Sequence, residues 1–399
     1  MHTPWIGSRK IAIIPAVVND PKFNPPPANW VDLIRQRIFY DPDPATGVDR
    51  SLRAYIHTIS YGRALLEADI YDPVTVPWSH CGATQDAAIQ ATPAAHAYEY
   101  ACVVFTAGTH GCNGWAFYDN PPFPFSPPPP SGTNNLRNWC YVSMGASLGV
   151  WSMEIMHAMT AFGDLYNTIP HPGNFDNMAC NCGTHPSTFT KLKLGWLNPS
   201  LVHTATDVNW DSIGHANQVV AMTAINNKLF AATSDNKLWW RDPVGTNVDW
   251  VEIGHANYVV AMAAINNKLF AATSDNKLWW RDPVGHGGTF TLHALALLQP
   301  PPPGRVTAVR ISSGISQRYF LVEARLRIDS YEKATPGISS GIPSEGVVVY
   351  EIDEAVWPVQ LRTPNALSLG QKYSNPAEKL EIEVTSSVPG GFTVAIRSV

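Results

Sequence analysis

The feature that most restricts the fold of this chain is a near-perfect internal repeat. Residues 210–249 begin WDSIGHANQVVAMTAINNKLFAATSDNKLWWRDPVG, and residues 250–285 read WVEIGHANYVVAMAAINNKLFAATSDNKLWWRDPVG. The copies are 40 residues apart, and from 213 to 245 only Gln218/Tyr258 and Thr223/Ala263 differ. The first copy predicts four strands separated by turn-forming residues: Asn209–Ile213, Val219–Ile225, Lys228–Thr233 and Lys237–Arg241. Four strands in about 40 residues is the size of one propeller blade.

The repeat motif, W…IGHA…V-AM-A-NNKLFAATSDNKLW-RDP, resembles tectonin-type repeats. The resemblance implies β-propeller blades, which in several such proteins bind glycans or microbial cell-surface sugars. Two blades cannot close a propeller, because the smallest needs about four. Exposed blade edges pair readily with other strands. We therefore expect assembly with further copies of the chain or with another protein, unless the pair stands as an open stack capped by the host domain.

Adjacent tryptophans in each repeat suggest a sugar site. Neighbouring strand residues point to opposite faces, so one side chain of Trp239/Trp240 and one of Trp279/Trp280 should be buried. The other can stack on a sugar ring. We assign Trp240 and Trp280 as candidate glycan-binding residues, with core packing as the competing interpretation.

Ahead of the repeats, the stretch 150–167 (VWSMEIMHAMTAFGDLYN) predicts a helix, because its apolar residues recur near the 3.6-residue period. Glu154 and His157 are three residues apart and share a face of this helix. Asp164 follows just past its end. These three side chains are suitable donors for a divalent metal.

Further segments occur in a fixed order around this helix: LRAYIHTISYGRALLEADIYDPVTVPW before it, then FDNMACNCG, THPSTFTKLKLGWLNPS, RYFLVEARLRIDSY and SEGVVVYEIDE. Together they resemble secreted metallopeptidases of the immune inhibitor A and gametolysin type. The resemblance implies a zincin-like fold, a zinc-binding helix with a third ligand near Gly163 or Asp164, and a methionine turn at Met178.

One substitution separates this chain from that pattern. A zinc-peptidase helix reads H-E-x-x-H, whereas this one reads M-E-x-x-H, so Met153 replaces the first histidine. A thioether suits copper(I) and not a zinc ion that activates water. We therefore expect zinc to be absent or weakly bound and hydrolysis to be lost, with Met153 packed in the core.

Two alternatives remain open. The first is an active secreted zinc endopeptidase with Glu154 as general base and an altered ligand set of His157, Asp164 and one loop histidine. The candidates for that histidine are His110, His171 and His185. The second is a structural calcium or zinc ion held by Glu154 and Asp164.

These features predict an α+β protein with an insertion. The zincin-like α/β domain comprises 1–203 and continues in 287–399, where it ends in a β-rich layer. The all-β module, 204–286, holds two four-stranded blades at about 208–245 and 248–285. The expected function is a non-catalytic metallopeptidase-like scaffold that displays repeats for surface or glycan recognition or for assembly.

Composition restricts the compartment and the partners. A net charge of −5 over 399 residues, without a basic run, argues against nucleic acid, and no apolar stretch approaches the eighteen residues of a membrane span. Only 15% of residues are charged, which favours an extracellular or surface-displayed protein. The first residues show no signal peptide, so export would need a removed leader or a non-standard route.

The six cysteines all lie between 81 and 182. Their even number and clustering predict up to three disulfides and an oxidising compartment. Cys180 and Cys182 are expected to pair with other cysteines, and Cys102 has an alternative as a buried free thiol.

Overall fold

The computed structural model describes residues 2–118, 121–129, 133–167, 169–205, 288–297, 299–313, 317–356 and 359–398. Between 206 and 287 it describes 219–225, 228–234, 237–241, 251–255, 259–265, 268–273 and 278–281. The described residues form helices and several open sheets, which confirms the α+β class. The chain divides into two compact units. Unit 1 is 1–199, 295–300 and 325–345, and unit 2 is 200–294, 301–324 and 346–399.

Unit 1 is built on one mixed sheet with the order β2-β1-β4-β6-β5, to which β3 adds by pairing with β1. Its strands are β1 (Gly7–Val18), β2 (Ala64–Ile70), β3 (Val74–Val76), β4 (Tyr100–Phe105), β5 (Gly114–Phe117) and β6 (Asn138–Ser143). All neighbours are parallel except the edge strand β5, which runs antiparallel to β6. Strand β4 reads YACVVF and is buried along its whole length, as a central parallel strand should be.

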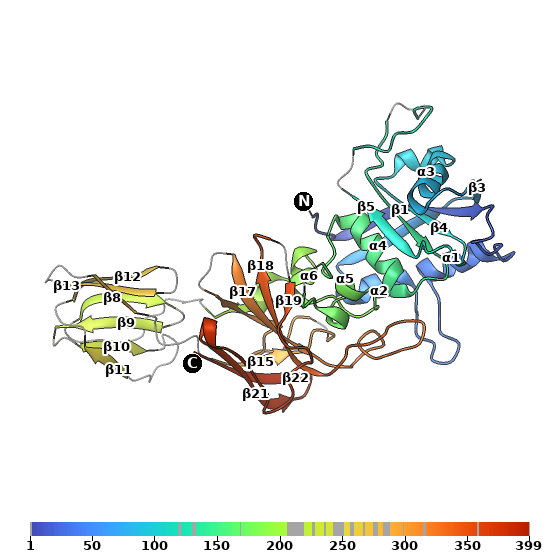
Figure 1. Ribbon diagram of the computed structural model, residues 1–399. Coiled ribbons are helices and arrows are strands. Elements are labelled where there is room, and N and C mark those ends of the chain that lie inside the picture. Colours follow the sequence, from blue (N-terminus) through green and yellow to red (C-terminus); the bar gives the residue numbers. More distant parts are fainter. Residues whose placement is uncertain are drawn as a thin grey trace. The chain divides into compact units, whose positions relative to one another are not determined.

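Six α-helices of unit 1 are described: α1 (Trp30–Phe39), α2 (Leu52–Ile59), α3 (Cys81–Gln90), α4 (Leu148–Thr160), α5 (Asn177–Cys180) and α6 (Thr188–Lys193). Three 3₁₀ turns accompany them, η1 (Pro93–Ala97), η2 (Gly173–Phe175) and η3 (Pro199–Leu201). Helix α4 lies against β5 and β6 (Figure 1). It ends before Asp164, as expected from the sequence.

Unit 2 holds two sheets outside the repeats. One has the order β19-β18-β17-β16-β7 and the other β15-β22-β21-β20. Their strands are β7 (Val202–Thr204), β15 (Gly288–His293), β16 (Ala308–Ser312), β17 (Arg318–Arg325), β18 (Gly346–Asp353), β19 (Val359–Leu361), β20 (Lys372–Asn375), β21 (Leu380–Val388) and β22 (Gly391–Ser398). A fourth 3₁₀ turn, η4 (Pro376–Glu378), joins β20 to β21.

The repeats form two further antiparallel sheets, β11-β10-β9-β8 and β12-β13-β14. Strands β8 (Val219–Ile225), β9 (Lys228–Thr233) and β10 (Lys237–Arg241) occupy the predicted ranges. The second copy supplies β11 (Val251–His255), β12 (Val259–Ile265), β13 (Lys268–Thr273) and β14 (Leu278–Arg281). The predicted strand Asn209–Ile213 lies outside the described residues.

The described strands of the four-stranded sheet come from both copies of the repeat. Strand β10 of the first copy pairs with β11, which belongs to the second copy. The four-stranded sheet therefore crosses the boundary between the repeats instead of coinciding with one of them.

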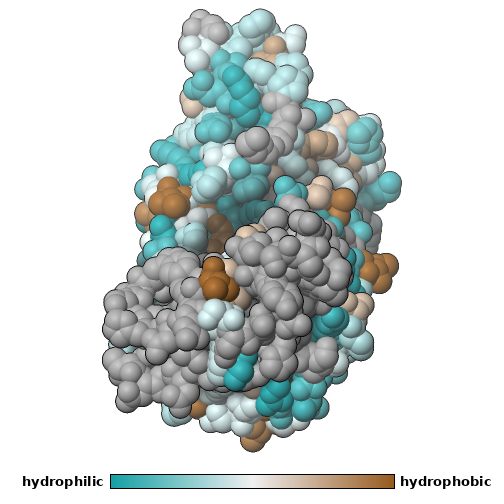
Figure 2. All heavy atoms as spheres, turned by 90° about the vertical axis from the view of Figure 1, so that its left-hand side faces the viewer, coloured by the Kyte–Doolittle hydropathy of each residue, from teal (hydrophilic) through white to brown (hydrophobic). Residues whose placement is uncertain are grey.

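The described surface is mixed in character. On the face shown in Figure 2, most of the coloured residues are hydrophilic or intermediate, with small separate hydrophobic spots. Among the described residues, no helix has both the length and the apolar character that a membrane crossing requires.

Candidate functional site

Helix α4 carries the residues that the sequence singles out and buries them. Its first turn is capped by Ser147, whose hydroxyl accepts a hydrogen bond from the Val150 amide at 3.3 Å. Met153, Glu154 and His157 are only 2%, 9% and 4% exposed. These side chains of the helix are therefore largely shielded from solvent.

The end of α4 brings Asp164 to the histidine. Ala161 adopts the left-handed conformation (φ 52°) and terminates the helix. The chain then turns back, so that the Phe162 carbonyl lies 2.5 Å from Nδ1 of His157, and Oδ1 of Asp164 lies 2.8 Å from Nε2. Asp164, not Gly163, is thus the residue beside the imidazole.

His157 and Asp164 form a close ion pair. Oδ1 of Asp164 is buried and has no aligned hydrogen-bond donor, although Nε2 is 2.8 Å away. Burial alone would lower the pKa of His157, but the adjacent carboxylate outweighs burial and raises it. Burial likewise would raise the pKa of Asp164, and the imidazole lowers it. The pair is therefore most stable as imidazolium and carboxylate.

Glu154 faces the edge strand β5. A Cβ atom on Gly114 would lie 2.7 Å from Cγ of Glu154 and 2.9 Å from its Oε1, so a larger residue at position 114 would force the Glu154 side chain to shift. Burial raises the pKa of Glu154 to about 7, with His157 opposing the rise and Asp164 adding to it. A carboxyl group with such a pKa exchanges its proton near neutral pH.

Two tyrosines border the pair. The ring of Tyr118 stacks on the imidazole of His157, with the centroids 5.8 Å apart and the planes 19° from parallel. Tyr166 is 42% exposed, and burial together with a hydrogen bond to Asp164 raises its pKa. Tyr166 is therefore the most exposed residue of this site, beside the partly exposed Asp164.

These residues do not fit a catalytic zinc ion. Such an ion needs three protein donors and an open fourth position, and only Nε2 of His157 and Oδ1 of Asp164 converge. Met153 occupies the position one turn earlier on the helix. Across the part of the chain that the structure describes, no three His, Cys, Asp or Glu side chains are grouped so as to hold a metal ion.

The three loop histidines considered as replacement ligands make other contacts. His110 places Nε2 3.1 Å from the Thr106 carbonyl. Nδ1 of His171 accepts a hydrogen bond from a backbone amide in its own loop. His185 places its two ring nitrogens against the side chains of Asp329 and Lys191, at 2.8 and 3.1 Å. None of these contacts completes the ligand set at α4.

A second group of buried polar side chains lies close to the start of α4, and the sequence analysis missed it. We call Asp176, Asn177, Ser187 and Thr190 the Asp176 cluster. Asp176 accepts hydrogen bonds from the amide and hydroxyl of Ser187, at 2.9 and 2.6 Å, and from the hydroxyl of Thr190 at 2.6 Å. Its other oxygen accepts from the Met178 amide at 2.9 Å. These bonds join α5 to the start of α6.

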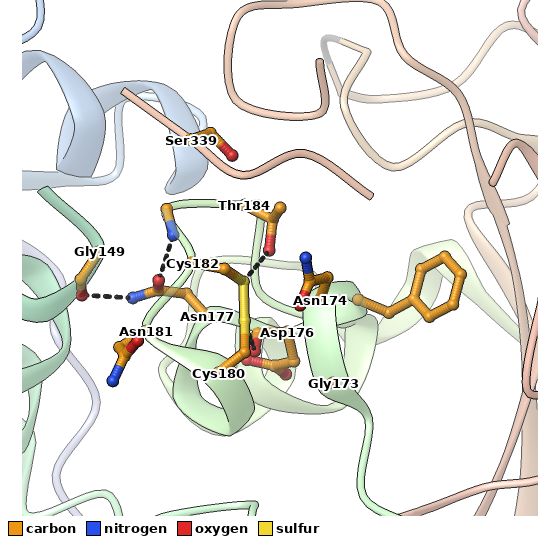
Figure 3. The surroundings of a disulfide bond; sticks show 12 residues. Gly149, Gly173, Asn174, Asp176, Asn177, Cys180, Asn181, Cys182, Thr184 and Ser339 are labelled. Atoms are coloured by element: carbon orange, nitrogen blue, oxygen red, sulfur yellow. Dashed lines mark hydrogen bonds between the residues drawn. A yellow bond between two sulfur atoms is a disulfide. The ribbon is translucent and has the colours of Figure 1, made fainter. Parts of the chain in front are cut away.

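Asn177 connects the same cluster to α4 (Figure 3). Its amide nitrogen donates to the Gly149 carbonyl at 3.2 Å and to the hydroxyl of Ser152 at 2.9 Å, and its oxygen accepts from the Gly183 amide at 2.7 Å. Met178, the expected methionine-turn residue, is fully buried in α5. The sequence signal for the cluster would have been the capping residues Asp176 and Ser187, each directly before a short helix.

A buried ionic network joins residues 185–191 to residues 325–332. Arg325 and Glu332 are both fully buried, and their side chains are 2.6 Å apart. Arg325 also donates to the His185 carbonyl at 3.0 Å. Burial lowers the pKa of His185, and Lys191 lowers it further. Although burial opposes the change, His185 holds the pKa of Asp329 at about 2. Buried charges of this kind require partners, and here each has one.

The cysteines form two disulfides, Cys81–Cys112 and Cys180–Cys182. The expectation that Cys180 and Cys182 pair elsewhere is wrong, because the turn at Asn181, whose φ is 49°, brings the two sulfurs together. The remaining pair, Cys102 and Cys140, are buried free thiols. They are register partners on the parallel strands β4 and β6.

Of the paired tryptophans in the repeats, the structure describes the side chain of Trp239. Trp239 is partly exposed, and its indole N–H donates to the hydroxyl of Thr233 at 3.1 Å. On the backbone, Trp240 is the register partner of Phe230. The side chains of the two glycan candidates, Trp240 and Trp280, lie outside the described residues.

Comparisons with known proteins give no family. No family model matches the sequence, and no curated protein matches it. Among solved structures, the computationally designed Ika8 protein aligns at 11% identity and a TM-score of 0.15 over 47% of this chain and 47% of its own. The designed Ika4 protein aligns at 11% and 0.16 over 38% and 94%, and YjhT at 8% and 0.14 over 43% and 60%. This chain thus spans about half the length of Ika8, and TM-scores of this size do not define a shared fold.

Proposed function

We propose that this protein is a non-catalytic metallopeptidase-like scaffold that displays tectonin-type repeats for recognition or assembly. The observation that carries the proposal is the buried thioether of Met153 one turn before His157. It leaves His157 and Asp164 facing each other as an ion pair in place of a three-donor zinc site.

The zincin-like part of the proposal is supported by the arrangement of unit 1. A helix bearing a glutamate and a histidine packs on the antiparallel edge strand of an otherwise parallel sheet. The loop after that helix supplies Asp164, and the helix of Met178 follows. In this arrangement Glu154 exchanges its proton near neutral pH, while His157 and Asp164 neutralise each other. Under this proposal the site lacks the zinc ion that would make water nucleophilic.

Metal content and proteolysis test the proposal together. The full chain, dialysed against excess zinc and then against buffer, should retain less than a stoichiometric amount of zinc. It should not cleave casein above the level of a Glu154→Gln variant, which serves as the matched control because it keeps the shape of the side chain. Stoichiometric zinc with cleavage that E154Q abolishes would refute the scaffold function.

The competing function is an active zinc endopeptidase with an altered ligand set. It is favoured by the contact of Nδ1 of His157 with the Phe162 carbonyl, since metal-binding histidines usually donate their second N–H in this way. A pKa near 7 would also suit Glu154 as general base. If the chain is a peptidase of this kind, its His157→Ala and Asp164→Ala variants should be inactive. Added zinc should restore activity to the metal-depleted parent chain and not to either variant.

For the repeats we propose a role in assembly or in glycan recognition. The period of 40 residues and the four-stranded antiparallel sheet support a blade-like module. Native mass spectrometry and light scattering should detect oligomers or complexes formed through the repeat edges, and a strict monomer with ordered blades would contradict assembly. A glycan array should show binding that Trp240→Ala and Trp280→Ala abolish, and unchanged binding would remove the glycan function.

A further inference from the structure

We infer that the Cys180–Cys182 disulfide is a thiol–disulfide exchange site coupled to the start of α4, a function separate from metal binding or recognition. Only Asn181 separates the two cysteines, and it adopts the left-handed conformation with φ 49°. A bond that closes so short a loop removes little disorder from the unfolded chain. This disulfide therefore adds little to the stability of the fold as a cross-link.

The surroundings of both sulfurs suit the reduced form. Sγ of Cys180 lies 3.4 Å from the carbonyl of Asp176, which can accept a hydrogen bond from a thiol. Sγ of Cys182 lies 3.2 Å from the hydroxyl of Thr184, which can donate to a thiolate. Both contacts belong to the group drawn in Figure 3. A dithiol at this position therefore finds its hydrogen-bond partners already in place.

The two cysteines also differ in exposure, and we infer the direction of attack from this difference. Cys180 is partly exposed, whereas Cys182 is 8% exposed. A thiolate of an external dithiol attacks Sγ of Cys180, forms a mixed disulfide and releases Cys182 as a thiolate, which Thr184 stabilises. The second thiol of the reagent then displaces Cys180 and closes its own disulfide. The chain gains two electrons and two protons, and the external dithiol is oxidised.

The loop between the cysteines is packed against the start of α4. A Cβ atom on Gly149 would lie 2.0 Å from the Asn181 carbonyl, so the two backbones are in direct contact. The hydroxyl of Ser147, the cap of α4, donates to the same carbonyl at 3.5 Å. On its other side the Cys182 carbonyl accepts from the Ser340 amide at 2.8 Å. Opening the disulfide relaxes a loop that holds the first turn of α4.

The test uses the native full chain in dithiothreitol redox buffers, with alkylation of thiols and peptide mapping by mass spectrometry. We compare the ratio of reduced to oxidised dithiothreitol at which each disulfide opens and its cysteines become labelled. This ratio should be at least about tenfold lower for Cys180–Cys182 than for Cys81–Cys112. The far-UV circular dichroism spectrum should stay unchanged when Cys180–Cys182 opens. If the short disulfide resists until Cys81–Cys112 opens, or opens only with unfolding, the inference is wrong.

Two further readouts separate the parts of the inference. Thr184→Val, which keeps the shape of the side chain, should slow reduction of Cys180–Cys182 by at least about threefold and leave that of Cys81–Cys112 unchanged. An unchanged rate would overturn the assigned leaving group. Hydrogen exchange after reduction should accelerate at residues 147–152 and not in β15, and equal protection in both redox states would overturn the coupling to α4. Neither result depends on whether the α4 site binds zinc, so failure here is distinguishable from failure of the proposed function.

Discussion

The α4 site and the Asp176 cluster both involve helix α4 and differ in how completely their polar groups are satisfied. In the Asp176 cluster both carboxylate oxygens accept aligned hydrogen bonds. In the α4 site a buried oxygen of Asp164 lacks an aligned donor, and Glu154 is buried with a pKa near 7. The Asp176 cluster therefore satisfies the carboxylate that it buries, whereas the α4 site buries polar groups that are only partly satisfied and offers fewer than the three donors that a zinc ion needs.

The greatest loss of stability is expected from removing the carboxylate at the centre of the Asp176 cluster. Asp176→Ala should lower the free energy of unfolding by about 4 kcal/mol, because it leaves several buried donors without an acceptor. Chemical denaturation monitored by circular dichroism measures this loss. Asp164→Ala is the matched control and should cost less than half as much. Equal losses at the two aspartates would show that the two regions do not differ as described.

Glu154→Gln should change the free energy of unfolding in the opposite direction and stabilise the protein. The folded pKa of Glu154, about 7, lies above the unfolded value, so the folded state binds more protons than the unfolded state between roughly pH 4.5 and 7. The carboxylate therefore destabilises the fold fully above pH 7 and not at all below about pH 4.5. Glu154→Gln should raise the free energy of unfolding by about 2 kcal/mol at pH 8 and by much less at pH 5. A gain that is the same at both pH values would contradict the raised pKa.

The disulfide beside the Asp176 cluster should matter less than its hydrogen bonds. Replacing both Cys180 and Cys182 by serine should cost about 1.5 kcal/mol, since the loop closed by the bond is three residues long. The Cys81–Cys112 disulfide closes a much longer loop, with a sequence separation of 31. Replacing both of these cysteines by serine should therefore cost about 4 kcal/mol. Thermal unfolding of the two variants tests the ratio. Equal costs would mean that the short disulfide is a structural cross-link.

The smallest loss of stability is expected at Tyr166, the exposed residue of the α4 site. Tyr166→Phe removes the hydroxyl that bonds Asp164, and the partly exposed position should limit the loss to about 0.5–1 kcal/mol. Denaturant titration of this variant beside the parent chain measures it. A loss above that of the Asp164→Ala variant would show that the hydroxyl, and not the ion pair with His157, holds the loop in place.

The sequence predicted what periodicity and composition determine. The helix with Glu154 and His157, the three strands β8, β9 and β10, and the α+β class were all anticipated. The ion pair of His157 and Asp164 was not predicted, because it depends on where the helix ends. Left-handed Ala161 sets that end, and no periodic pattern marks such a residue. The Asp176 cluster was missed because its partners come from three helices, and the pairing of β10 with β11 because repeat boundaries in sequence need not be sheet boundaries. Cys180–Cys182 was missed because separation along the chain does not reveal a turn.

The most direct test of the account restores the missing donor. Zinc affinity of the parent chain and of Met153→His, measured by competition with a chromophoric chelator, asks whether one side chain separates this site from a zinc site. We expect the substitution to tighten zinc binding at least about 100-fold and His157→Ala to reverse the gain, because a third protein donor completes the ligand set. Tight stoichiometric zinc in the parent chain, unchanged by Met153→His, would contradict the account.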